Sequence, residues 1–513
     1  MKLTTFALLA LALASCGKDS SSGNGPPLDA NQFLLPLGTI PQLDLVFMID
    51  NSPSMAPKQA KLRAQFPKLI EALKNPGDGS LPDLRIAIID SDLGTGGAYA
   101  NGSCGPKLLF DGTSSPYGDQ GKFQMLGAAG CGVTNPNALW LEYQGGAPVN
   151  FTGDINAVFA CLAGNLGTLG CGMEQQLLSY EFALAAKGLN NDVQQTILRP
   201  GAYLGLVFLS DEDDCSASLN DGMYGDKSEA RGESASLRCA TRAHACGGRN
   251  LTDAPPGYPT TDSFEAPFAS CTARTDACPN PIANGKKTDT SQPTSCSPLL
   301  GVKGIAKSMK ELKKYPGEQV LVSGIFGWPL SDADMATATY KIAPVPNPNT
   351  ADTVHPTVFD SLPVCYDPNH LPTNPDPATG VDMEAVGFGA TGGLRMSAFV
   401  DEFGANGQKF SICQPDFTAA MSQIGATLSK KMRNQCVPTS YTQTPQCTAS
   451  YATPDGLSKS IPVCDATESV VPCYSLVSDQ NLCPGDAYLV HLNRGIGAAD
   501  QVPAGTWLVF TCP

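Results

Sequence analysis

The sequence is short of positive charge. Its 513 residues include 33 Lys and Arg against 48 Asp and Glu, which gives a formal net charge of −15. No long basic block interrupts this acidic balance. Because nucleic acids and anionic membrane surfaces bind proteins through clustered positive charge, we expect no nucleic-acid partner and no membrane binding by charge. The length is sufficient for a sizeable core and more than one domain.

Long hydrophobic runs are missing beyond the N-terminus, which reads MKLTTFALLALALASC. This stretch joins a basic Lys2 to an apolar run over residues 6–13 and small residues before Cys16. It predicts a secretory signal over residues 1–15, too short to span a membrane stably. Residues 16–42 then include GKDSSSGNGPP, a Gly/Ser/Pro-rich composition typical of a flexible tether.

The end of the signal, Leu13-Ala14-Ser15-Cys16, resembles the lipobox of bacterial lipoproteins. The resemblance implies that Cys16 is lipidated and becomes the first residue of the mature protein. An ordinary signal peptide that is cut nearby, with Cys16 left free, is the alternative. The resemblance therefore predicts an exported protein, lipid-anchored in the bacterial cell envelope at the outer membrane, facing the periplasm or the surface. The lipid is its only expected membrane contact.

Zinc-type spacing is absent. The chain has four histidines, no CxxC pair, and no histidine placed to complete a zinc set. The cysteines other than Cys16 fall instead into even groups of four (104–171), six (215–296), two (365 and 413) and six (436–512). Such grouping predicts disulfides within segments, formed in an oxidising compartment.

Catalytic motifs are missing as well. The chain has no HExxH, GxSxG or Walker-type sequence. GFGATG (387–392) matches GxGxxG but follows no clear buried strand, which favours a Gly-rich loop. The run Asp211-Glu212-Asp213-Asp214 lacks the Gly and distal Glu of an EF-hand, so a solvated acidic loop is expected there. We expect no enzyme.

Short apolar runs alternate with helical patterns along most of the chain. The runs do not alternate internally, which is typical of strands covered on both faces of a parallel sheet. Apolar residues between them recur at helical spacing. The pattern predicts an α/β sandwich, a mainly parallel sheet between helices. The expected strands are 43–49, 84–89, 203–209, 319–326 and 408–413; the expected helices are 55–73 (with Pro67 kinking or splitting it), 173–189, 299–315 and 417–432.

Long polar stretches rich in Gly, Pro and Cys separate these elements, at about 93–166, 212–297 and 328–383. They are too long for simple loops, so we interpret them as disulfide-rich insertions in an α/β domain over 43–435. Residues 436–513 differ in composition, with six cysteines and short strand-like pieces at 487–492 and 506–510. They predict a small disulfide-rich β module.

Acids and hydroxyls follow three of the predicted strands. The first strand ends at Asp50, with Ser52 and Ser54 at alternate positions; the others end at 90–92 and 210–214. Because ligands of an open parallel sheet bind outside the carboxyl ends of its strands, these side chains are expected to meet. Hydroxyl and carboxylate oxygens are hard ligands suited to Mg²⁺ or Ca²⁺. Turn formation with a Ser54 helix cap is the structural alternative, which leaves Asp50 and Ser52 unexplained.

Asp50-Asn51-Ser52-Pro53-Ser54 resembles the D-x-S-x-S motif of von Willebrand factor type A (VWA) domains, and Asp211 matches that family's second acidic position. The resemblance covers 43–435 and implies a Rossmann-like VWA sandwich with a metal-ion-dependent adhesion site (MIDAS). In that family the two serines bind the metal directly, usually Mg²⁺, the acids act largely through water, and a middle-loop threonine completes the set. Thr168 is the choice here, with Glu174 or Thr95 as alternatives; Mn²⁺ and Ca²⁺ are alternative metals.

The resemblance implies that this cation holds a protein partner, whose identity is unknown, through an acidic residue of that partner. Two alternatives stay open. The chain could be a structural envelope protein whose metal site is vestigial or purely stabilising, or, less in keeping with its motifs, a metal-dependent hydrolase that uses the acids.

Overall fold

The computed structural model describes most of residues 41–433 and shorter pieces at both ends. The described residues are 32–36, 41–75, 79–95, 104, 107–108, 114–115, 118–125, 127–185, 190, 194–217, 224, 234–251, 263–277, 296–297, 299–347, 356–377, 379–433, 436–438, 448–452, 458–465, 473–477, 487–493 and 507–511. The signal, Cys16 and the first part of the tether lie outside them, so lipidation stays a prediction. Within these ranges no helix is long and apolar enough to cross a membrane.

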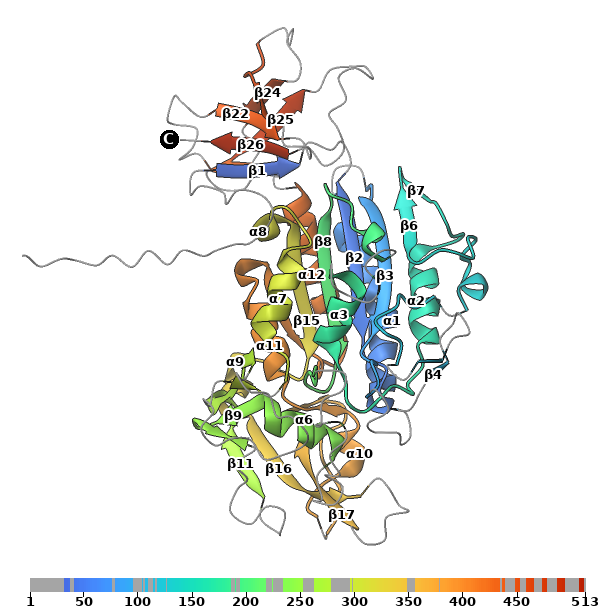
Figure 1. Cartoon of the computed structure of the whole chain (residues 1–513), viewed down its shortest axis with the longest axis vertical. Helices are drawn as coiled ribbons and strands as arrows, with labels where there is room; N and C mark the ends of the chain where they lie inside the picture. Colours follow the sequence, from blue (N-terminus) through green and yellow to red (C-terminus); the bar gives the residue numbers. More distant parts are fainter. Residues whose placement is uncertain are drawn as a thin grey trace, which may run out of the picture.

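A seven-stranded sheet forms the centre of the molecule (Figure 1). Its order is β20-β15-β8-β2-β3-β6-β7, parallel from β20 to β3 and antiparallel at β6 and β7. All the strands predicted for this sheet from the sequence are present. The bounds are β2 Gln42–Ile49, β3 Asp83–Asp90, β6 Leu141–Gln144, β7 Ala147–Pro148, β8 Tyr203–Ser210, β15 Val320–Phe326 and β20 Gly407–Ser411.

Helices cover both faces of this sheet, as the apolar runs predict. Alternate residues of β2 supply the two cores: Phe47 packs with helices on one face, and Val46 and Met48 pack with helices on the other. The first face carries α1 (Ala56–Leu73), α2 (Ile155–Asn165) and α12 (Thr418–Arg433); the second carries α3 (Gln176–Leu184), α7 (Val302–Lys310) and α11 (Leu394–Asp401). The chain is therefore a mixed α/β protein with a mostly parallel central sheet.

Two sequence-based expectations differ from the structure here. The sequence predicted a kink or a split at Pro67, and the split is wrong, because helix α1 is continuous through Pro67. Packing of α1 against α2 and α12 holds the helix together. The stretch 93–166 is more than an insertion, because it supplies β6, β7 and α2 to the central layers. The two edge strands are short, but α2 is an apolar helix of 11 residues that the sequence analysis missed.

The stretches 212–297 and 328–383 fold together. Strand β11 (Phe264–Pro267) of the first pairs with β16 (Thr339–Pro346), and β16 pairs with β17 (Thr357–Leu362) of the second. Figure 1 shows this sheet at one end of the central sheet. Both stretches leave the central sheet after the carboxyl ends of strands, β8 and β15, so this small sheet lies at the same edge as the predicted site.

The C-terminal residues form strands at the opposite end (Figure 1), as predicted, but the N-terminal tether joins them. Strand β1 (Gln32–Pro36) pairs with β26 (Trp507–Thr511), and β26 continues to β22 (Thr448–Ala452) and β23 (Ser458–Ile461). Trp507 also packs edge-on against Tyr203 and Tyr315, which lie beside the amino ends of central strands. Part of the expected tether over 16–42 is thus a strand.

Six disulfides join described cysteines, and each lies within one of the predicted groups. The pairs are Cys104–Cys171, Cys131–Cys161, Cys215–Cys239, Cys246–Cys271, Cys365–Cys413 and Cys464–Cys473. The prediction of pairing within segments is confirmed for these cysteines. Such density of disulfides is typical of an exported protein.

Candidate functional site

The segment after β2 turns sharply at Asp50. Its backbone N–H still donates to the Leu209 carbonyl (3.0 Å), which extends the ladder with β8 by one bond. The Asp50 side chain then accepts from the N–H of Ser52 (2.8 Å), a local contact that turns the chain. Pro53 opens a short 3-10 helix (Pro53–Met55) that leads into α1. The sequence Asp-x-Ser-Pro therefore favours a turn directly at the carboxyl edge of the sheet.

Three strand ends meet at this turn, as the sequence predicts. Asp50, at 0% exposure, accepts hydrogen bonds from Ser210 after β8 (2.5 Å) and from Ser91 after β3 (3.2 Å). The side-chain amide of Asn51 donates to the carboxylate of Asp90 (3.1 Å), the last residue of β3. Since β2 lies between β3 and β8, its ending is the point from which both neighbours can be reached.

Ser54 does not cap the helix, which corrects the structural alternative. Its hydroxyl donates to Oδ1 of Asp211 (3.1 Å) and lies 3.3 Å from the Ser52 hydroxyl. The other oxygen of Asp211 accepts from the Lys58 ammonium, 2.6 Å away. Four of the predicted metal ligands, Asp50, Ser52, Ser54 and Asp211, are thus gathered in one place, with a lysine that the sequence analysis missed. The signal for Lys58 was its position one helical turn after Ser54.

The predicted middle ligand is less closely tied to the cluster. The loop of Thr168 lies against the motif, because Gln59 donates both to the Asp50 carbonyl (2.8 Å) and to the Gly167 carbonyl (3.1 Å), and Gly170 N–H donates to Asn51 (2.7 Å). Across the part of the chain that the structure describes, the Thr168 hydroxyl has no hydrogen-bond partner. Thr95 lies elsewhere in its own loop, where its hydroxyl donates to the Cys104 carbonyl (3.5 Å).

Glu174, the other alternative, lies within the electrostatic reach of the cluster. Its side chain is 2% exposed, and its Oε1 is buried without a hydrogen-bond partner. Its backbone is fixed on both sides: Cys215 N–H donates to the Glu174 carbonyl (2.8 Å), and the next residue's N–H donates to Ser91 (2.9 Å). Buried carboxylate oxygens are normally paired, so this oxygen is available to a hydrogen-bond donor or to a cation.

The buried acids shift one another's pKa values. Burial, followed by the charge of Asp211, raises the pKa of Asp50 to about 6 and that of Glu212 to about 8. Burial, with the charges of Glu212 and Asp50, raises the pKa of Glu174 well above its usual range. Each shift has the same cause, namely negative charge held away from water. A cation among these groups would relieve it.

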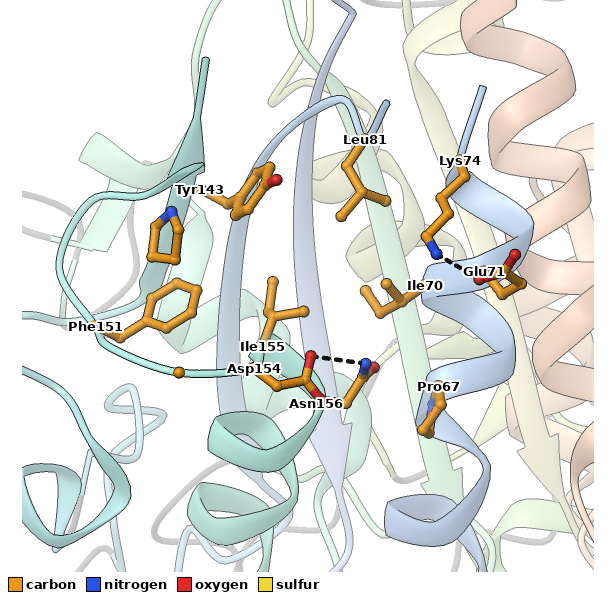
Figure 2. Close-up of a pocket in the computed structure, with 12 residues that line it drawn as sticks. Pro67, Ile70, Glu71, Lys74, Leu81, Tyr143, Phe151, Asp154, Ile155 and Asn156 are labelled. Carbon is orange, nitrogen blue, oxygen red and sulfur yellow. Dashed lines mark hydrogen bonds and ion pairs between the residues drawn. The ribbon is translucent and has the colours of Figure 1, made fainter. Parts of the chain in front are cut away.

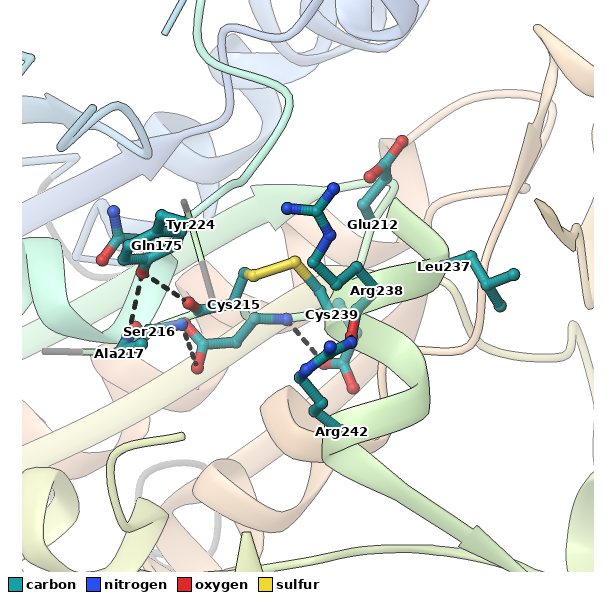
Figure 3. Close-up of a disulfide and its surroundings, with 12 residues drawn as sticks. Gln175, Glu212, Cys215, Ser216, Ala217, Tyr224, Leu237, Arg238, Cys239 and Arg242 are labelled. Carbon is teal, nitrogen blue, oxygen red and sulfur yellow. Dashed lines mark hydrogen bonds between the residues drawn. A yellow bond between two sulfur atoms is a disulfide. The ribbon is translucent and has the colours of Figure 1, made fainter. Parts of the chain in front are cut away.

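The last two acids of the 211–214 run have a structural role, which corrects the expectation of a solvated loop. Asp213 is 6% exposed and accepts from the N–H groups of Arg395 and Met396 at the start of α11 and from His244. Asp214 forms a buried ion pair with Arg395 (3.0 Å). Figure 3 shows the neighbouring disulfide Cys215–Cys239, which ties this loop to α6 (Ala235–Ala243).

A separate cavity of about 310 Å³ lies far along α1. Figure 2 shows it between the second half of α1, the start of α2 and the β6–β7 edge, with Ile70, Tyr143, Phe151 and Ile155 among its lining residues. Glu71, at its rim, is fifteen residues after the start of α1, or about 22 Å along the helix. The cavity is therefore not part of the motif's cluster.

The donor set at the motif fits a hard divalent cation. Within the described ranges, no group of three or more His, Cys, Asp or Glu side chains forms a metal site by itself. The cluster instead combines hydroxyls with carboxylates, ligands that Mg²⁺, Mn²⁺ and Ca²⁺ accept. Two oxygens bound to one octahedral Mg²⁺ lie about 3.0 Å apart, close to the 3.3 Å between the Ser52 and Ser54 hydroxyls. Glu174, whose charge interacts with those of Asp50 and Asp211, is the candidate for a further donor.

No protein-family model matches the chain, and no curated protein matches its sequence. Matching solved structures include the pilus adhesin SpaC from Lactobacillus rhamnosus GG in its open conformation, at 9% identity over 93% of this chain, with a TM-score of 0.28. The adhesive tip pilin GBS104 from Group B Streptococcus agalactiae matches at 11% identity over 94% of this chain and 80% of its own, also with a TM-score of 0.28. The chain spans 39% of SpaC. These scores are too low to indicate a shared fold.

Proposed function

We propose that this chain is an exported VWA-like binding protein whose motif holds a divalent cation, chiefly Mg²⁺. Ser52 and Ser54 would bind the cation directly. Asp50 and Asp211 would stabilise it through their negative charge, and Glu174 or Thr168 would complete the set. One observation carries this proposal: Ser54 and Asp211, 157 positions apart, are 3.1 Å from each other beside the Ser52 hydroxyl. Turn formation alone does not require that convergence.

The bound cation would supply an open coordination position that an acidic side chain of a protein partner can fill. The surroundings support a role in contact with another molecule. Pro53 is exposed, and Leu169, next to Thr168, is 80% exposed on the loop that contacts Asn51. A large apolar side chain beside a polar site is a suitable contact residue. Presentation from a lipidated Cys16 belongs to the same proposal.

The alternative of a structural envelope protein, with a vestigial or purely stabilising site, has one observation in its favour. The Lys58 ammonium pairs with Asp211 at 2.6 Å and supplies positive charge without a metal. In that case the motif stabilises the carboxyl edge of the sheet and captures nothing.

The test is titration of the purified protein with Mg²⁺ and Mn²⁺. Calorimetry measures binding, and thermal unfolding measures the gain in stability. Wild type should bind and gain thermal stability; Asp50→Ala and Ser52→Ala should lose both effects. Glu71→Ala is the matched control, because it removes an acid that is 69% exposed at the other end of α1. Equal responses of wild type and both motif variants would refute the metal site. Binding of arrayed peptides with single Asp or Glu residues, in Mg²⁺ but not in EDTA, then tests the partner.

A further inference from the structure

Lys58 brings a positive charge to the edge of the candidate metal site, beside Asp211. Its side chain is 4% exposed, and its ammonium donates to Oδ2 of Asp211 (2.6 Å), to the Ser54 carbonyl (3.2 Å) and to the Gly387 carbonyl (3.1 Å). All three donor positions of the ammonium are therefore used. Two of the partners, Ser54 and Asp211, belong to the predicted metal-binding set.

The position of this ammonium bears directly on cation binding. Asp211 uses one oxygen for Ser54 and the other for Lys58. A divalent cation at the serines would lie close to this ammonium, because Ser54 and Lys58 contact the two oxygens of the same carboxylate. At such separations in a buried site, repulsion between like charges is strong. The same acids attract both cations, so the two compete for Asp211.

The third partner links Lys58 to the chain that follows the insertion at 328–383. Gly387 follows the short helix α10 (Met383–Val386), and four residues later Thr391 N–H donates to the Asp211 carbonyl (2.9 Å). Lys58 thus bridges the motif, Asp211 and the segment 387–391, which also contacts the Asp211 backbone. Removal of the ammonium from Asp211 would also release its hold on Gly387.

We propose that Lys58 is an internal cation that competes with the divalent metal for Asp211 and thereby sets the metal affinity of the site. The inference rests on the proposed metal-binding function and goes beyond it. When no metal is bound, the Lys58 ammonium takes its place beside Asp211. Metal binding then requires Lys58 to give up its contact with Asp211, and the contact with Gly387 becomes weaker with it.

The experiment compares Mg²⁺ and Mn²⁺ affinities of wild type, Lys58→Met and Lys61→Met by calorimetry. Lys61 is the matched control, since its ammonium pairs with Asp367 at the same 2.6 Å from the same helix but outside the motif. Lys58→Met should bind metal at least about tenfold more tightly, whereas Lys61→Met should stay within about twofold of wild type. Lys58→Met should also lose thermal stability without metal and recover it with metal, because Asp211 is left unpaired.

The outcomes separate this inference from the proposed function. Equal or weaker metal binding by Lys58→Met, with binding by wild type, overturns the role of Lys58 alone. Binding by Lys58→Met but not by wild type supports that role and overturns the metal-binding function of the natural chain. Absence of binding by both overturns both. A measurement on wild type does not depend on whether the variant folds. The ¹⁵N ammonium resonance of Lys58 should change on Mg²⁺ addition, while that of Lys61 does not. An unchanged Lys58 resonance in metal-bound protein also overturns the inference.

Discussion

The hydroxyl of Ser54 donates a hydrogen bond to Oδ1 of Asp211 at 3.1 Å, although 157 positions separate the two residues. The contact exists because β2 and β8 are parallel neighbours, so that both side chains follow strand ends at the same edge. Two further contacts define the surroundings of this pair: the Lys58 ammonium on Asp211 and the close approach of Gly170 to Asn51. The predictions below start from this geometry.

Gly170→Ala should disturb the site while Gly172→Ala should not. A Cβ on Gly170 would lie 2.1 Å from Oδ1 of Asn51 and 2.8 Å from its carbonyl, whereas a Cβ on Gly172 meets nothing within 4 Å. We expect Gly170→Ala to cost about 1–3 kcal/mol of unfolding free energy and to weaken Mg²⁺ binding, because the loop must move away from the motif. Urea unfolding and calorimetry measure both effects. Equal behaviour of the two variants would contradict the close packing of this loop.

Glu174→Gln should weaken Mg²⁺ binding by about tenfold or more and leave the metal-free protein as stable as wild type or more so. The reason is that the Glu174 carboxylate is buried among Asp50, Asp211 and Glu212, where its charge is unfavourable unless a cation is present. Thr168→Val is the comparison, and its Mg²⁺ affinity should stay within about twofold of wild type. The reverse pattern would identify Thr168 as the middle ligand. Thermal shifts with and without metal give the readout.

Asp360→Asn should reduce the loss of stability between about pH 4 and pH 6. Burial raises the pKa of Asp360 from 3.8 to about 6, against hydrogen bonds from Ser234 and the Ser361 N–H. Below pH 4 the side chain is protonated in both states; as the pH rises towards 6 the unfolded chain releases the proton first, so the free energy of unfolding falls. The loss is at most about 3 kcal/mol, and the partial exposure of Asp360 reduces it.

Urea unfolding at pH 4 and pH 7 in EDTA measures this effect. Asp50 and Glu212 also titrate from raised pKa values, so wild type should keep a residual pH dependence that the variant shares. An identical pH slope in wild type and Asp360→Asn would contradict the prediction.

Removal of the disulfide Cys365–Cys413 by serine substitution should destabilise the α/β domain more than removal of Cys464–Cys473 destabilises the C-terminal strands. The first closes 48 residues and the second closes 9. By the loop-entropy relation the costs are about 4 and about 2.5 kcal/mol. Guanidinium unfolding without reductant should resolve them. If the first substitution costs less than the second, chain entropy is not the main contribution of these bonds.

Much of the central architecture could be predicted from local sequence. The runs at 43–49, 84–89 and 203–209 are apolar on both faces, a pattern that suits a strand between two layers of helices, and all three became strands. Pro67 shows the limit of local reasoning, because tertiary packing kept α1 intact around it. Strands β6 and β7 were missed, since four and two residues at a sheet edge carry too little hydrophobic periodicity to detect.

By itself, the sequence pointed to Asp50, Ser52, Ser54 and Asp211 as residues that meet, because their hard oxygens follow apolar runs that predict neighbouring parallel strands. It also predicted that cysteines pair within segments, as the described cysteines do. Only the tertiary structure decided which distant residues meet. It placed Lys58 on Asp211, buried Glu174 among the acids and paired β1 with β26. These relationships join residues distant along the chain, and their energies depend on burial, which a linear pattern does not contain.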